Sequence, residues 1–210
     1  MKIARITCCL FVLLLSLVAF AFSTSAPRAY AASGTTIVLK FHGPSVFANF
    51  DNLSPDGCIE TAVSVDAFQN TVHNQTISEA DILIGQFDNC RRIVLLDAFG
   101  SNFNANFQVG NKLLSAALNT TISVTDILTG NTFPVSVNLA WTSTSAITHE
   151  DQIIHFHTQG FIANAHFNTD FRLANASGTV SAGTTNFTPS PSVFAQIALA
   201  KDVSVAITLP

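Results

Sequence analysis

Apolar and polar side chains alternate along most of this chain, and this period of two limits the folds that it can adopt. The clearest case is the segment from Leu118 to Trp141. Alternation holds from Leu118 to Val124 and again from Val135 to Trp141, and Thr129-Gly130-Asn131 supplies a turn between them. Because successive side chains of a strand point to opposite faces, the segment is predicted to form a β-hairpin with one buried and one solvated face.

The same alternation predicts further strands at 36–41, 58–68, 82–87, 92–99, 103–109, 152–157, 161–167, 194–199 and 203–209. Asn175 to Ser192 is rich in Ser, Thr, Gly and Pro and is predicted to be a loop. Many short strands without a convincing helix predict an all-β chain. We expect an antiparallel β-sandwich of immunoglobulin-like or jelly-roll-like type.

The N-terminus has the parts of a secretory signal peptide. Lys2 and Arg5 make it positive, an apolar run follows from Leu10 to Phe22, and Ala29-Tyr30-Ala31 offers a cleavage pattern. The apolar run is shorter than the roughly 20 residues of a membrane-spanning helix. We therefore expect residues 1–31 to be a cleaved signal peptide, residues 32–210 to form one β-sandwich domain, and the protein to be secreted with no membrane span after cleavage.

Two cysteines, Cys58 and Cys90, follow the expected cleavage site. In an oxidising compartment such a pair predicts a disulfide bond. The alternatives are two free thiols or a pair of metal ligands, and export makes both less favourable.

Basic residues are few beyond residue 31. The whole chain has a net charge of −4, and removal of Lys2, Arg5 and Arg28 gives −4 − 3 = −7. A nucleic-acid-binding protein needs a dense cationic surface to neutralise phosphates, and the remaining bases are scattered. We therefore expect neither a nucleic acid nor an anionic membrane as a partner.

Phenylalanine is the main aromatic residue, and 18 − 3 = 15 copies remain after cleavage because Phe11, Phe20 and Phe22 are removed. Its side chain carries a large apolar area without a polar group, so we expect most copies to fill the space between two packed layers. Trp141 shares its parity with Val137 and Leu139 and is also expected in the core.

Three of the six histidines lie within the segment IIHFHTQGFIANAHF, at His155, His157 and His166. On a strand, His155 and His157 point to one face, and His166 joins them if Gly160 turns the chain. Imidazole nitrogens in such an arrangement bind zinc, copper, iron or nickel. The alternative is a plain solvent-facing surface, because His166 alternates with Ala165 and Phe167 just as His155 alternates with Ile154 and Phe156.

The H-x-H pair resembles the metal motif of cupins, which are β folds of two sheets. That resemblance implies a metal at His155 and His157, but the motif has a glutamate shortly after the second histidine, where this chain has Thr158 to Ile162. The longer stretch HFHTQGFIANAHFNTDFRLANASGTV is similar to runs in uncharacterised secreted bacterial β-proteins. This second resemblance implies no assigned function.

Signatures of common catalytic sites are missing, including G-x-S-x-G, H-E-x-x-H and a phosphate loop. We therefore expect no catalytic residues and no cofactor, and a structural, adhesive or binding role toward an extracellular ligand or surface. The alternative function is a metal-binding module or metal-dependent enzyme that uses His155, His157 and His166. Stoichiometric metal that is lost when His155 and His157 are replaced by alanine would favour the alternative.

Overall fold

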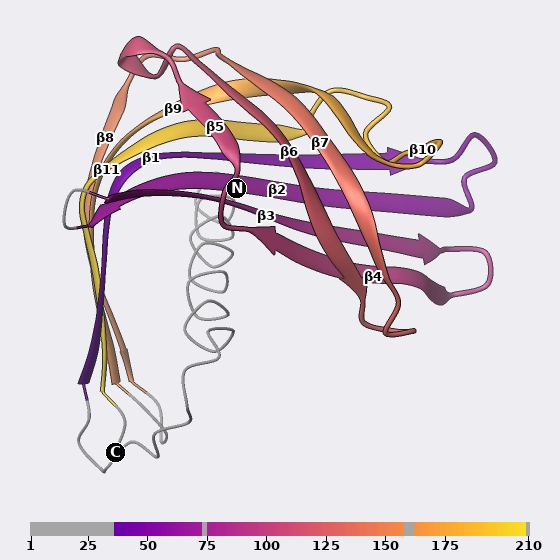
Figure 1. Ribbon diagram of the computed structural model, residues 1–210, viewed down its shortest axis with the longest axis horizontal. Coiled ribbons are helices and arrows are strands. Elements are labelled where there is room, and N and C mark those ends of the chain that lie inside the picture. The colour runs from indigo at the N-terminus through magenta and orange to yellow at the C-terminus, as the bar shows by residue number, and fades with distance from the viewer. Residues whose placement is uncertain (1–35, 73–74, 158–161, 209–210) are drawn as a thin grey trace. The chain divides into compact units, whose positions relative to one another are not determined.

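The computed structural model describes residues 36–72, 75–157 and 162–208 (Figure 1). The expected signal peptide and its cleavage site lie outside the described residues, and the division at residue 31 stays a prediction. Residues Thr36–Thr208 form one unit. No helix in the described part of the chain has the length and apolar character needed to cross a membrane.

Strands make up nearly all of this unit, together with one short 3-10 helix at Asn111–Leu113. The strands are β1 (Thr36–Leu53), β2 (Ile59–Val72), β3 (Gln75–Asp88), β4 (Ile93–Asn102), β5 (Asn106–Val109), β6 (Ser115–Asp126), β7 (Thr132–Ser143), β8 (Thr148–His157), β9 (Ile162–Ala182), β10 (Thr185–Asn186) and β11 (Phe194–Thr208). The all-β class expected from the alternation is confirmed, and so is the hairpin from Leu118 to Trp141, which is formed by β6 and β7.

The strands belong to one hydrogen-bonded sheet, and each pair of neighbouring strands is antiparallel. A path through hydrogen-bonded neighbours runs from β9 through β11, β1, β2, β3, β4, β6 and β7, and then returns to β9. The sheet therefore closes on itself. The contact between β4 and β6 is the shortest ladder on this path, with the two pairs Ala98–Asp126 and Phe99–Thr125.

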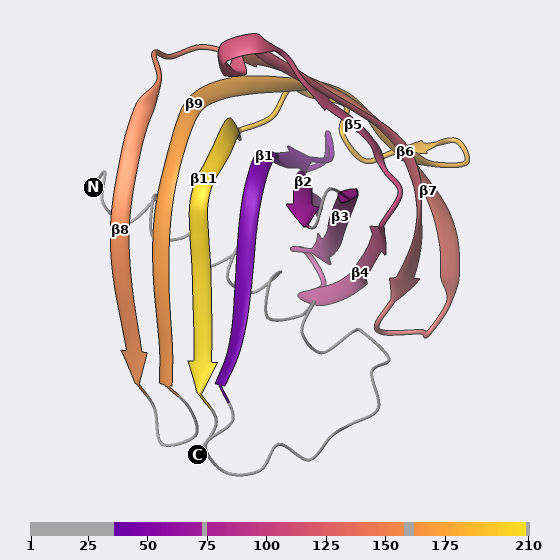
Figure 2. The same cartoon turned by 60° about the vertical axis from the view of Figure 1, so that its left-hand side comes forward.

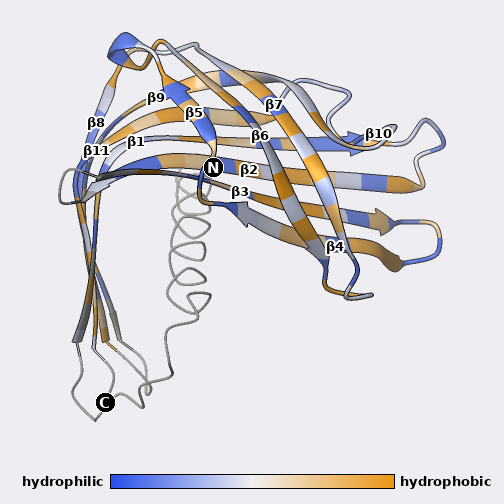
Figure 3. Cartoon of the chain, viewed as in Figure 1, coloured by the Kyte–Doolittle hydropathy of each residue, from blue (hydrophilic) through white to orange (hydrophobic). Residues whose placement is uncertain are grey.

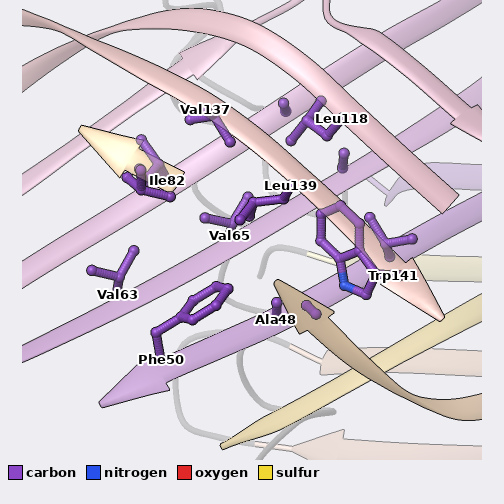
Figure 4. Close-up of a cluster of buried hydrophobic side chains, with 14 of the residues drawn as sticks. Ala48, Phe50, Val63, Val65, Ile82, Leu118, Val137, Leu139 and Trp141 are labelled. Atoms are coloured by element: carbon purple, nitrogen blue, oxygen red, sulfur yellow. The ribbon is translucent and has the colours of Figure 1, made fainter. Parts of the chain in front are cut away.

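The core lies between two opposed halves of this closed sheet (Figure 4). Phe50 and Val65 come from the half that contains β1 and β2, and Leu118 and Trp141 come from β6 and β7. Full burial of side chains of this size stabilises a fold by roughly 1.5–3 kcal/mol each. The expected core position of Trp141 is confirmed, and its indole Nε1 donates a hydrogen bond of 3.0 Å to the carbonyl oxygen of Phe47.

Phenylalanine contributes less to this core than expected. Phe50, Phe107 and Phe187 are buried in it, but Phe87 and Phe99 are 37% and 53% exposed. The cause is strand parity, because Phe99 follows buried Ala98 and must point the other way. Valine, isoleucine, leucine and alanine supply most of the core. Apolar residues recur along the strands (Figure 3).

The long strands β1, β9 and β11 bend and continue beyond the core, where β8 joins them (Figure 2). We call this part the four-stranded extension, with the order β8-β9-β11-β1. A register shift between Phe41 and Gly43 marks the bend in β1. Gly43 has φ +153°, and a Cβ atom there would lie 2.0 Å from the carbonyl oxygen of Gln69, so only glycine fits.

The loop expected from Asn175 to Ser192 is wrong for its first half. Residues 175–182 continue β9 and pair with β7, from Thr142–Asn175 to Ser136–Ser181. Ala176 and Val180 are buried there, while Asn175, Ser177 and Thr179 point to solvent. The buried residues on this stretch are few and mostly small, so the sequence pattern resembles a loop although the backbone is a strand.

The disulfide bond between Cys58 and Cys90 is confirmed. Its Cα atoms are 5.2 Å apart, and the two cysteines are separated by 32 residues. Cys58 precedes β2 and Cys90 lies in the turn between β3 and β4, so the bond ties two turns at the same end of the sheet.

Candidate functional site

Two of the three predicted histidines share one face of the four-stranded extension. β8 and β9 are antiparallel neighbours, with Ile153 opposite His166 and His155 opposite Asn164. Residues that are directly opposite share a face, so the side chains of His155 and His166 both lie on the face that carries Asp151. The backbone of His157 pairs with Ile162 on the same register, but its side chain lies outside the described residues.

Each described histidine on this face already has a polar partner. Nδ1 of His155 lies 2.7 Å from Oδ1 of Asn164, which only accepts, so the imidazole donates. Nε2 of His166 lies 3.0 Å from Oδ1 of Asp151, and its Nδ1 lies 3.9 Å from Oδ2 of Asp202. Asp151 and Asp202 lie beside different ring nitrogens of His166, so these three side chains do not converge on one point.

The described residues include no group of three or more His, Cys, Asp or Glu side chains that could hold a metal ion. One oxygen on this face is left without a partner, since Oδ1 of Asn168 is buried and accepts no hydrogen bond from the described residues. The arrangement of His155, His166 and Asp151 is that of a hydrogen-bonded polar surface. The predicted metal site at His155, His157 and His166 stays a prediction.

A second ionic group ties together three strands of the extension. Nζ of Lys201 lies 2.8 Å from Oδ1 of Asp170, and Nδ1 of His149 lies 3.0 Å from the same oxygen. The hydrogen bond from Lys201, followed by that from His149, lowers the pKa of the Asp170 carboxyl. These contacts join β8, β9 and β11.

A cluster of three carboxyls lies on β2 and β3, on the side of the sheet that points away from the core. Asp66 lies directly opposite Asp81, and Glu79 is two residues before Asp81 on β3. Ser101 of β4 is opposite Asp81 and hydrogen-bonds to it. Glu79 is only 2% exposed. Carboxyls are seldom buried without a base beside them, which makes this cluster a candidate site.

Burial raises the pKa of all three carboxyls. It raises the pKa of Glu79 to about 8, with a further contribution from the charge of Asp81. The pKa of Asp66 is well above its usual range because of burial and then the charges of Asp81 and Glu79. Burial also raises the pKa of Asp81, against the opposing hydrogen bond from Ser101. The cluster therefore retains protons at neutral pH.

We call the side of β2, β3 and β4 that points away from the core the outer face. The three strands contain no Lys, Arg or His. Their carboxyl residues are Glu60, Asp66, Glu79, Asp81, Asp88 and Asp97. Asp88 has the parity of the core side and accepts hydrogen bonds from the turn amides of Cys90 and Arg91. The remaining carboxyls lie on the outer face without a base on the same strands.

Large apolar side chains are exposed beside these carboxyls. Leu83 and Phe99 are directly opposite each other and are 50% and 53% exposed. Phe87 and Val94 form a second exposed pair at the end of the sheet near the disulfide. Large exposed apolar side chains that share one face of a folded chain are a common sign of a binding site.

The outer face was not predicted from the sequence. The absence of bases from residues 59–72, 75–88 and 93–102 was visible there, as were the acidic residues. The missing information was which strands are neighbours, because Asp66 and Asp81 meet only through the pairing of β2 with β3.

Comparison of the chain with protein-family models, with curated proteins and with solved structures gave no match. Any functional argument for this protein therefore depends on the chemistry of its own residues.

Proposed function

We propose that this protein is a secreted, non-catalytic binding protein, and that it binds a cationic amphipathic peptide segment on the outer face of β2–β4. The observation that carries the proposal is that the acidic residues Glu60 and Asp97 and the exposed apolar pairs share one surface, with no base on its three strands. The expected signal peptide and the disulfide between Cys58 and Cys90 support a role outside the cytoplasm. We also infer that the opposed halves of the closed sheet act as the two layers of a sandwich.

The apolar pairs supply the attraction at short range. Leu83 and Phe99 are each about half exposed, so a partner that covers them removes apolar area from water. The gain is roughly 1 kcal/mol for each side chain, or about half the value for full burial. A partner segment that presents apolar and cationic side chains side by side can contact both the apolar pairs and the carboxyls of this single face.

The carboxyls supply the preference for a cation. Glu60 and Asp97 are acidic residues beside the apolar pairs. The strands themselves contain no lysine or arginine, and the adjacent bases Arg91 and Arg92 lie in the turn before β4, where Arg91 pairs with Asp88. An anionic partner is repelled, and a cationic partner is attracted before contact. The affinity is therefore expected to fall as the salt concentration rises.

The test uses a peptide of alternating lysine and leucine, with a matched peptide of alternating glutamate and leucine, in calorimetric titrations. We expect the lysine peptide to bind, and the double variant Leu83→Ser/Phe99→Ser to weaken binding about tenfold or more. Leu173→Ser, which changes a leucine of β9 that is 44% exposed, is the matched control and is expected to have no effect. Equal binding of both peptides, or an unchanged affinity in the double variant, would contradict the proposal.

Metal binding through His155, His157 and His166 is the second proposed function. It is supported by the common face of His155 and His166 and by the unpartnered Oδ1 atom of Asn168. A metal would have to replace the hydrogen bonds of these histidines to Asn164 and Asp151, which makes this function the less favoured of the two.

A further inference from the structure

β8 is an open edge of the sheet. Among the described residues its backbone pairs only with β9, and it lies at the border of the four-stranded extension (Figure 2). The two ends of the strand path, β10 and β5, are much shorter at Thr185–Asn186 and Asn106–Val109. Open edges present unpaired N–H and C=O groups that another strand can use, and soluble proteins usually protect them with proline, bulges or charged side chains. β8 contains no proline, no glycine and no register shift, and its acids Glu150 and Asp151 lie in one half of the strand.

The most exposed large apolar side chain of the described residues lies at the middle of this edge. Ile153 is 65% exposed, compared with 63% for Val193 and 61% for Leu53. The acids Glu150 and Asp151 precede Ile153, and His155 follows it. When such a strand is placed antiparallel to a copy of itself, the acidic half of each copy lies beside the histidine half of the other.

We propose that two copies of this chain pair through antiparallel β8 strands centred on Ile153, so that the two extensions form one continuous sheet. In this register Ile153 lies opposite Ile153 of the second copy, and Asp151 lies opposite His155 in two symmetric pairs. Apolar cross-strand pairs stabilise a sheet by roughly 0.2–1 kcal/mol each, and the polar side chains of Asp151 and His155 lie side by side across the interface. The arrangement is a closed twofold interface in which both copies use the same surface.

A slip of one residue between the two β8 strands would move the side chains that lie beside Ile153 to the opposite face of the sheet, so registers of that kind are excluded. Two adjacent registers keep the faces. The one centred on Ile154 places Ile153 opposite His155, which loses the apolar contact. The one centred on Gln152 places Asp151 opposite Ile153 and His149 opposite His155. It loses the apolar contact and sets histidine against histidine. This interface lies in β8, outside the outer face of β2–β4, so the inference does not depend on the proposed function.

The first experiment is sedimentation equilibrium of the purified protein over a range of concentrations. We expect a monomer–dimer equilibrium whose dissociation constant rises about tenfold or more in Ile153→Lys, because two lysines then lie directly opposite each other. Val193→Lys is the matched control, since this residue is equally exposed and lies outside β8, and its equilibrium should match the unmodified protein. A protein that is monomeric at every concentration would overturn self-pairing and leave the edge to a strand of a different protein.

The second experiment tests the register. Directly opposite residues of antiparallel strands have Cα atoms about 4.5–5.5 Å apart, which suits a disulfide. Ile153→Cys should therefore form a disulfide-linked dimer under mild oxidation, whereas Val193→Cys should not. Cross-linking of both variants to the same extent, or of neither, would overturn the proposed register.

Discussion

Glu79 is a carboxyl with almost no solvent contact, on a strand that has no base. Its pKa in the folded chain is about 8, compared with an ordinary value of 4.5. Between these two pH values the folded chain holds a proton that the unfolded chain has released, so the free energy of unfolding falls as the pH rises across this window. The loss of stability caused by the ionisation of Glu79 is absent below pH 4.5 and constant above about pH 8.

Replacement of this carboxyl by an amide should remove the penalty. Glu79→Gln is expected to raise the free energy of unfolding by up to roughly 4 kcal/mol at pH 8 and to leave it nearly unchanged at pH 4.5, because the amide cannot ionise. Urea denaturation at the two pH values measures both quantities. Glu150→Gln in β8 is the control, and an equal gain in both variants would show that the effect does not come from the buried cluster.

Among the elements, β9 depends on one glycine where it pairs with β7. Gly178 has φ +131°, and a Cβ atom there would lie 2.1 Å from the carbonyl oxygen of Asn138. Gly178→Ala is therefore expected to destabilise the fold by roughly 2–4 kcal/mol, because either the strand or its neighbour must move. Thermal unfolding gives the change, with Gly85→Ala in β3 as the control.

Gly85 has open space around its Cα atom and no left-handed φ. Its replacement by alanine should change the free energy of unfolding by less than about 1 kcal/mol. Similar losses in the two variants would mean that the close approach at Gly178 is not what limits β9.

The elements that could be predicted from sequence are those whose evidence is local. The hairpin of β6 and β7 has regular alternation on both strands and a turn between them, so its faces and its core residues followed from parity. The middle of β1 contains Gly43 and Pro44, which normally indicate a break, yet one bent strand continues through them with a register shift between Phe41 and Gly43. The end of β9 was missed because its buried residues, such as Ala176, give a weak apolar signal.

The candidate sites divide in the same way. The common face of His155 and His166 could be predicted, because it needs only the parity of two adjacent strands. The outer face could not, because its acidic and apolar residues come from three strands whose order the sequence does not state. Whether Phe99 points into the core or to solvent also depends on which side of that sheet is covered.

For the molecule as a whole, the disulfide between Cys58 and Cys90 reduces the conformational entropy of the unfolded chain. A bond that closes a loop of this length stabilises the folded state by roughly 3–4 kcal/mol on the chain-entropy estimate. Cys58→Ala/Cys90→Ala is expected to lose about this much in chemical denaturation. Addition of a reductant should lower the stability of the unmodified protein to that of the variant and should not affect the variant, and a response of the variant would contradict this assignment.

The pairing of β1 with β11 joins segments that lie far apart in the sequence, from Thr36–Thr208 to Asn49–Phe194. Contacts of such long range form late, since the intervening chain must first be present. During synthesis β1 therefore has no second neighbour until almost the entire polypeptide has left the ribosome. A nascent chain of this design cannot close its sheet until synthesis is nearly complete.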